Sequence, residues 1–90
     1  MFECQFNGRL CVLSLDAVKD MARHDISPFV VREIIECGQE FSDTKMGRGE
    51  LGRCIRRKDD VVFVKLVPSY SFSLDEEVWL VKHVGRGKLR

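Results

Sequence analysis

The residues best suited to chemistry are a lysine and a histidine in the second half of the chain. Lys65 interrupts the apolar segment 61–67, and because a buried unpaired ammonium is costly, it must reach water or an anion. His83 follows Lys82 and can titrate near neutral pH. A histidine beside basic residues suits general acid–base catalysis of phosphodiester cleavage, although a strand-end histidine that merely packs is the simpler alternative.

Further basic residues surround these two and suggest a nucleic-acid partner. Arg53 and Arg57 are expected on one face of their strand and Arg56 on the other. Basic side chains on a sheet can hold the phosphates of single-stranded RNA. Alternatively, they only cover the solvated face and edges of an antiparallel sheet. The candidate nucleic-acid-binding residues are Arg48, Arg56, Arg57, Lys82, Arg86 and Lys88.

The cysteines give little support for a metal site. Cys4, Cys11, Cys37 and Cys54 include no CxxC pair, so zinc binding is disfavoured and no cofactor is expected. Cys4 and Cys11 would face each other across a hairpin at a hydrogen-bonded position, where side chains lie farther apart. This geometry disfavours an unstrained disulfide, and we expect free thiols.

Local signals predict a hairpin followed by two helices. Asn7-Gly8 is a strong hairpin-turn signal between strands 2–6 and 9–13. Ser14 is a candidate N-cap for the first helix, and His24 would lie in its last turn, where it complements the helix dipole. Ser27-Pro28 begins the second helix, and Gly38 suits a left-handed position at its end.

The remaining segments predict a sheet for these helices to cover. We expect a flexible loop over 39–50, strands over 51–57, 61–67 and 77–84, and a serine-rich loop over 68–76. The strand 61–67 is apolar on both faces and should be central. The predicted fold class is α+β, with two helices packed on an antiparallel sheet in the order ββααβββ.

Length, charge and hydropathy indicate the general class of protein. Ninety residues predict one domain, 1–90, of which 29 residues are Leu, Ile, Val or Phe. The net charge of +1 hides an asymmetry, because residues 1–44 carry −4 and residues 45–90 carry +5. With neither an apolar run long enough for a membrane span nor a signal peptide, we expect a cytoplasmic protein.

A family resemblance rests on the first half of the chain. The segment Leu13-Ser14-Leu15-Asp16-Ala17, followed by Met21, Ile26-Ser27, Val31 and Gly38, resembles an uncharacterised small domain family (a DUF). That family is related to the RelE- and BrnT-type toxins of toxin–antitoxin systems. The resemblance implies a RelE-like fold and, as in active relatives, metal-independent RNA cleavage by attack of the 2′-hydroxyl on the adjacent phosphate.

The resemblance also implies roles for individual residues. Arg53 and Lys65 would stabilise the transition-state charge, and His83 would transfer the proton. The family typically has a histidine where this chain has Asp16 and often arginines at Asp20 and His24. Carboxylates at that edge would repel phosphate, so whether the chain is an active endoribonuclease is left open.

A second hypothesis is a non-enzymatic interaction module, or an inactive relative, that pairs through its sheet edge. Joint exposure of Phe2, Phe6 and Phe41 would favour it. The partners considered are RNA, an antitoxin-like protein and a second copy of this chain.

Overall fold

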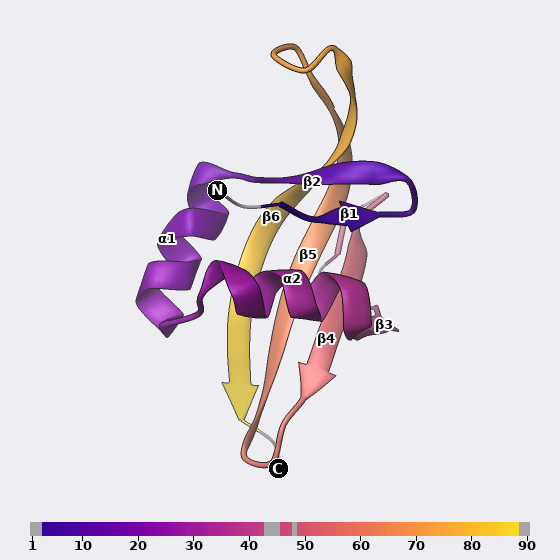
Figure 1. Ribbon diagram of the computed structural model, residues 1–90. Helices are drawn as coiled ribbons and strands as arrows, with labels where there is room; N and C mark the ends of the chain where they lie inside the picture. The colour runs from indigo at the N-terminus through magenta and orange to yellow at the C-terminus, as the bar shows by residue number, and fades with distance from the viewer. Residues whose placement is uncertain (1–2, 43–45, 48, 89–90) are drawn as a thin grey trace.

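The computed structural model describes residues 3–42, 46–47 and 49–88 and has an α+β fold with two helices and a curled sheet (Figure 1). The elements in chain order are β1 (Gln5–Phe6), β2 (Arg9–Leu13), α1 (Leu15–His24), α2 (Pro28–Cys37), β3 (Gln39–Phe41), β4 (Leu51–Arg56), β5 (Asp60–Ser71) and β6 (Glu76–Lys88).

The sheet is mixed, so the prediction of a purely antiparallel sheet is wrong. Its strand order is β1-β2-β6-β5-β4-β3. All neighbours are antiparallel except β2 and β6, which run parallel with Leu13 opposite Val81. Both helices and three strands separate β2 from β6 along the chain. Because the direction of this pairing is set at long range, no local pattern could indicate it.

Strands also extend where we expected loops. Gln39–Phe41 pairs with β4 as β3, so the loop predicted over 39–50 is wrong there, and the observed order differs from ββααβββ. Strands β5 (Asp60–Ser71) and β6 (Glu76–Lys88) pair along their full lengths as one long hairpin. This hairpin takes in most of the predicted loop 68–76, and β6 continues beyond the predicted strand 77–84 as far as Lys88. Pro68 is compatible with a strand here, because β4 pairs with β5 only as far as Leu66, which leaves Pro68 beside an open edge.

The predicted helix starts are confirmed. The Ser14 hydroxyl accepts a hydrogen bond from Ala17 N at 3.0 Å, and the Ser27 hydroxyl accepts one from Val30 N at 3.3 Å. Gly38 is not left-handed as predicted, since its φ of −79° and ψ of −177° are extended. Glycine is required for space instead, because a Cβ would lie 2.6 Å from the Cys54 carbonyl oxygen.

Both helices lie on one face of the sheet (Figure 1), and the buried core forms between them and β5 and β6. The helices contribute Ala17, Met21, Val31, Ile34 and Ile35, and the two long strands contribute Val62, Val64, Leu66, Val81 and Val84. Neither ten-residue helix of the described chain has the length and apolar character needed to cross a membrane.

The opposite face of the sheet, here called the helix-free face, is covered by aromatic rings instead. The Phe41 ring lies over Gly52 and the Phe63 ring lies over Gly85, where an added Cβ would come within 2.6 Å and 2.2 Å of the respective ring. The two rings meet edge to face, with centroids 5.9 Å apart. Glycine in the neighbouring strands therefore makes room for the rings.

Candidate functional site

Lys65 and His83, two of the residues expected to do chemistry, are cross-strand neighbours. Lys65 pairs with His83, and the register then shifts so that Leu66 pairs with Val81. This bulge leaves Lys82 as an extra residue on β6. Since Val64 and Leu66 on either side of Lys65 are fully buried beneath the helices, alternation places Lys65 on the helix-free face.

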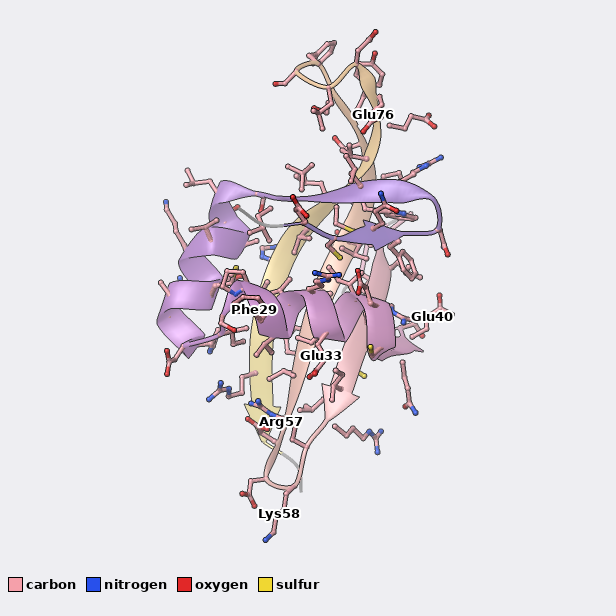
Figure 2. The ribbon with its side chains drawn as sticks, viewed as in Figure 1. Phe29, Glu33, Glu40, Arg57, Lys58 and Glu76 are labelled. Atoms are coloured by element: carbon pink, nitrogen blue, oxygen red, sulfur yellow. The ribbon has the colours of Figure 1, made fainter. Side chains whose placement is uncertain are left out.

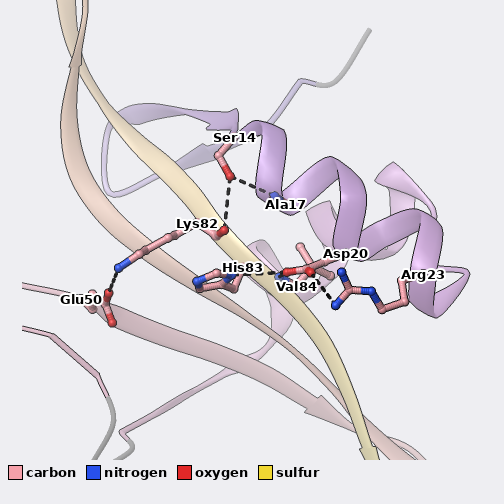
Figure 3. Close-up of polar contacts among 8 residues, drawn as sticks. All are labelled: Ser14, Ala17, Asp20, Arg23, Glu50, Lys82, His83 and Val84. Atoms are coloured by element: carbon pink, nitrogen blue, oxygen red, sulfur yellow. Dashed lines mark hydrogen bonds and ion pairs between the residues drawn. The ribbon is translucent and has the colours of Figure 1, made fainter.

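A carboxylate from α1 approaches the ring of His83 (Figure 3). Asp20 Oδ2 lies 3.4 Å from His83 Nδ1 and accepts a hydrogen bond from Val84 N at 3.2 Å. Its other oxygen lies 3.6 Å from Arg23 Nη1, and its side chain is 15% exposed. A carboxylate beside Nδ1 favours the tautomer with its proton on that nitrogen, which leaves Nε2 as a proton acceptor.

The start of α1 is also attached to β6 near His83. Ser14 N donates to Val81 O at 3.1 Å, and the Ser14 hydroxyl donates to Lys82 O at 3.2 Å (Figure 3). Together with Asp20 and Val84, these bonds hold α1 along the edge of β6 beyond its pairing with β2. The position of Asp20 beside His83 is therefore set by backbone contacts as well as side chains.

Glu50 connects this site to the segment before β4. Its Oε1 lies 2.7 Å from Lys82 Nζ, its other oxygen accepts a hydrogen bond from Gly47 N at 2.9 Å, and its side chain is 7% exposed. The bond from Lys82 holds the pKa of Glu50 below its ordinary value, with further contributions from Gly47 N–H and the charge of Lys65. Lys65, Lys82, His83, Asp20 and Glu50 form what we call the Lys65–His83 cluster.

Arg53 does not join this cluster. It follows Gly52, which pairs with Lys65, so its side chain lies on the opposite, helix-covered face. There its Nε donates to Ile35 O at 3.1 Å, and its guanidinium lies 5.0 Å from the centre of the Phe6 ring. Arg53 thus connects the end of α2 to β1, and the three residues predicted to be catalytic do not converge.

The predicted nucleic-acid-binding residues are also dispersed. Arg57 donates two hydrogen bonds of 2.8 Å to Asp60 and lowers the pKa of that carboxyl, and Arg86 lies 3.3 Å from the same group. Arg56 is exposed at the end of β4. Lys82 alone belongs to the cluster, while Lys88 ends β6 and Arg48 lies outside the described residues.

Aromatic residues extend the site along the helix-free face. Phe41 and Phe63, both half-buried, lie over the glycines described above. Gly52 is the β4 partner of Lys65, and Lys65 is the β5 partner of His83. The Phe41 ring, which lies over Gly52, is therefore next to this pair on the same face of the sheet. Trp79 does not contribute to this surface, because its Nε1 donates a hydrogen bond to Phe6 O at 3.0 Å and its ring packs against the core.

The structure agrees with two narrower expectations, the free thiols and the place of the second histidine. The four thiols are free, and His24 lies in the last turn of α1. Within residues 3–42, 46–47 and 49–88, no group of three or more His, Cys, Asp or Glu side chains is placed to hold a metal ion.

Sequence reasoning missed two members of the cluster. Asp20 was considered only as a source of repulsion, yet its spacing of three from Ala17, which is buried, indicates an inward-facing position. Glu50 carried no comparable signal, because its contacts with Gly47 and Lys82 arise from a turn and a distant strand.

No family model, curated protein or solved structure matches this chain. The relation to the toxin-associated family therefore stays a prediction from the residues that carry it.

Proposed function

We propose that the helix-free face binds single-stranded RNA and that the Lys65–His83 cluster cleaves it without a metal ion, in the manner of a RelE-like toxin-type domain. The observation that carries the proposal is the pairing of Lys65 with His83, whose Nδ1 lies 3.4 Å from the Asp20 carboxylate. This pairing supports the proposal because an ammonium group, an imidazole and a carboxylate able to orient the imidazole then lie close together.

Each member of the cluster has a role in the proposed reaction. His83 Nε2 accepts the proton of the 2′-hydroxyl, and the 2′-oxygen attacks the adjacent phosphorus as the bond to the 5′-oxygen breaks. The departing oxygen takes a proton from water. Lys65 stabilises the charge that develops on the phosphate, and Asp20 stabilises the imidazolium that forms on His83.

The acidic residues in the cluster do not remove its attraction for phosphate. Asp20 is already paired with Arg23, and Glu50 with Lys82. With three basic residues (Lys65, Lys82 and a protonated His83) against two carboxylates, the formal charge of the cluster is positive during the reaction. The half-buried rings of Phe41 and Phe63 provide surfaces on which bases can stack beside it.

The test is cleavage of a labelled single-stranded RNA by the purified protein in the presence of EDTA. We expect products that end in a 2′,3′-cyclic phosphate. His83→Ala should lower the rate about 100- to 10,000-fold, and Lys65→Ala should also lower it. Lys19→Ala is the matched control, because it removes an exposed charge from α1, away from the helix-free face. Unchanged cleavage in His83→Ala would contradict the mechanism.

If the protein binds RNA but does not cleave it, the proposed RNA-binding face stands and the proposed enzymatic activity is wrong. Binding should then weaken in Lys65→Ala but not in Lys19→Ala, as measured by fluorescence anisotropy at low salt. Raising the salt concentration should weaken binding further, because phosphate contacts release counterions. Equal binding by both variants would contradict the proposed face.

A second candidate function is protein binding, favoured by exposed apolar residues elsewhere. The residues first considered for this do not form a patch: Phe6 packs on Trp79, Phe41 packs on Phe63, and Phe2 lies outside the described residues. The exposed large apolar side chains are Leu15, Val18, Phe29, Tyr70, Phe72 and Leu74.

These side chains occupy the two helices and the β5–β6 turn, where an antitoxin-like protein or a second copy of the chain could dock. Figure 2 labels Phe29 at the start of α2, and its side chain is 83% exposed. Light scattering would show a dimer, and Phe29→Ser should abolish it. A monomer at all concentrations would exclude self-association.

A further inference from the structure

Two cysteines lie opposite each other in the β1–β2 hairpin. Cys11 N donates to Cys4 O at 2.9 Å, which continues the register of Gln5 with Leu10 and Phe6 with Arg9. Because the two residues are directly opposed, their side chains are on the same side of the hairpin. They are 3% and 5% exposed, and neither takes part in the proposed RNA site.

Although little of either cysteine is exposed, both border an open cleft. The cleft has a volume of about 760 Å³ and lies between the hairpin, α2 and the β5–β6 turn. Arg32 and Glu36 from α2, which form an ion pair of 3.2 Å, line it together with Leu74. The two cysteines therefore lie at the wall of a cleft that opens to solvent.

The positions of the two residues allow a bond between their sulfurs. Directly opposed residues at a hydrogen-bonded position have Cα atoms about 5.5 Å apart. This separation lies within the range found for disulfides, so the backbone need not move. The side chains diverge more at such positions than in relaxed disulfides, which makes the bond strained and easily reduced.

We propose that Cys4 and Cys11 form a reversible redox pair, which hydrogen peroxide converts from two thiols to an intramolecular disulfide. The Cys4 thiolate attacks one peroxide oxygen, which yields a sulfenic acid and releases water once a proton is taken up. The Cys11 sulfur then attacks the Cys4 sulfur and displaces the hydroxyl group as a second water. Two thiols lose two electrons and two protons, and one peroxide becomes two waters.

The surroundings assign the first step to Cys4. Interaction with the Cys11 thiol lowers the pKa of Cys4, assisted by the Arg32 charge and opposed by burial and by the Glu36 carboxylate. The same interaction, together with burial, raises the pKa of Cys11. Cys4 is thus the more readily ionised and attacking thiol, and Cys11 is the resolving one.

The test uses the variant Cys37→Ser/Cys54→Ser, in which only the pair remains. Peroxide treatment of the folded protein should remove two hydrogens from its mass and block both thiols to alkylation together, without forming a covalent dimer. Reduced glutathione should restore both thiols. Adding Cys11→Ser should abolish the hydrogen loss and lead instead to oxygen addition at Cys4.

Several outcomes would overturn the proposal. They are oxygen addition at Cys4 while Cys11 still alkylates, a covalent dimer as the main product, no reaction of the folded protein, and a disulfide that resists glutathione. Peptide mapping of the peroxide-treated natural sequence provides the same readout without any substitution, so an unstable variant does not prevent the test.

Discussion

Replacement of Asp20 separates its structural role from its proposed role beside His83. Its carboxylate accepts the Val84 N–H at 3.2 Å, and Val84 is 2% exposed. In Asp20→Ala this N–H loses its partner in a place that little water reaches. A buried unsatisfied donor costs roughly 1–3 kcal/mol, so we expect Asp20→Ala to lower the free energy of unfolding by about 2 kcal/mol.

Asp20→Asn retains an oxygen that can accept the same hydrogen bond but removes the charge. Because hydrogen bonds to charged groups are about twice as strong as neutral ones, we expect a loss of about 1 kcal/mol. The matched control is Asp16→Asn, an exposed carboxylate in the first turn of α1. It loses only its interaction with the helix dipole, about 0.5 kcal/mol.

Urea unfolding at pH 7, followed by circular dichroism, measures these three differences. In thermal unfolding, Asp20→Ala should lower Tm by roughly 8–16 °C, since 1 kcal/mol corresponds to about 4–8 °C in a domain of this size. If Asp20→Ala and Asp16→Asn differ by less than about 0.5 kcal/mol, the Val84 contact does not support α1 as described. Asp20→Asn remains folded, so its RNA cleavage rate reports on what the Asp20 carboxylate contributes to His83, both in orienting the ring and in stabilising the imidazolium.

Three further predictions concern packing within the sheet and the Glu50 carboxylate beside it. Gly85→Ala places a Cβ 2.2 Å from the Phe63 ring, so urea unfolding should show a loss of about 1–3 kcal/mol. Gly87→Ala, whose Cβ would meet its nearest atom at 3.4 Å, is the control and should lose less. Leu66→Ala opens a cavity at a fully buried position and should cost about 2–5 kcal/mol in the same assay; a smaller loss would place Leu66 outside the core. The pKa of Glu50 is lower in the folded than in the unfolded chain, so its stabilising effect is present at neutral pH and is lost as the pH falls through the folded-state pKa. The stability advantage of the natural protein over Glu50→Gln should therefore shrink on acidification, and a constant difference from pH 7 to pH 3 would contradict this.

Local signals in the sequence determined the helices and the first turn. Ser14, Ser27 and Pro28 predict helix starts because capping satisfies amides within the same few residues. The turn at Asn7-Gly8 set the hairpin register, with Phe6 opposite Arg9 as expected, because a two-residue turn leaves only one pairing. These interactions need no distant partner, so the sequence alone specifies them.

Pairing between distant segments was decided only in the tertiary structure. The parallel contact of β2 with β6 and the addition of β3 depend on how the helices direct the chain across the sheet. The same packing turned Arg53 toward the end of α2, while the alternation of β5 directed Lys65 to the helix-free face.

The candidate site depends both on local sequence and on tertiary contacts. The sequence by itself identified Lys65 and His83 as the residues most suited to chemistry, because a lysine within an apolar strand and a histidine among basic residues are unusual in type. Only the tertiary structure placed them opposite each other and brought Asp20 to His83 from a helix 63 residues earlier. The residue types and their neighbours can be read directly from the sequence. The geometry of a site depends on contacts between segments far apart in the chain.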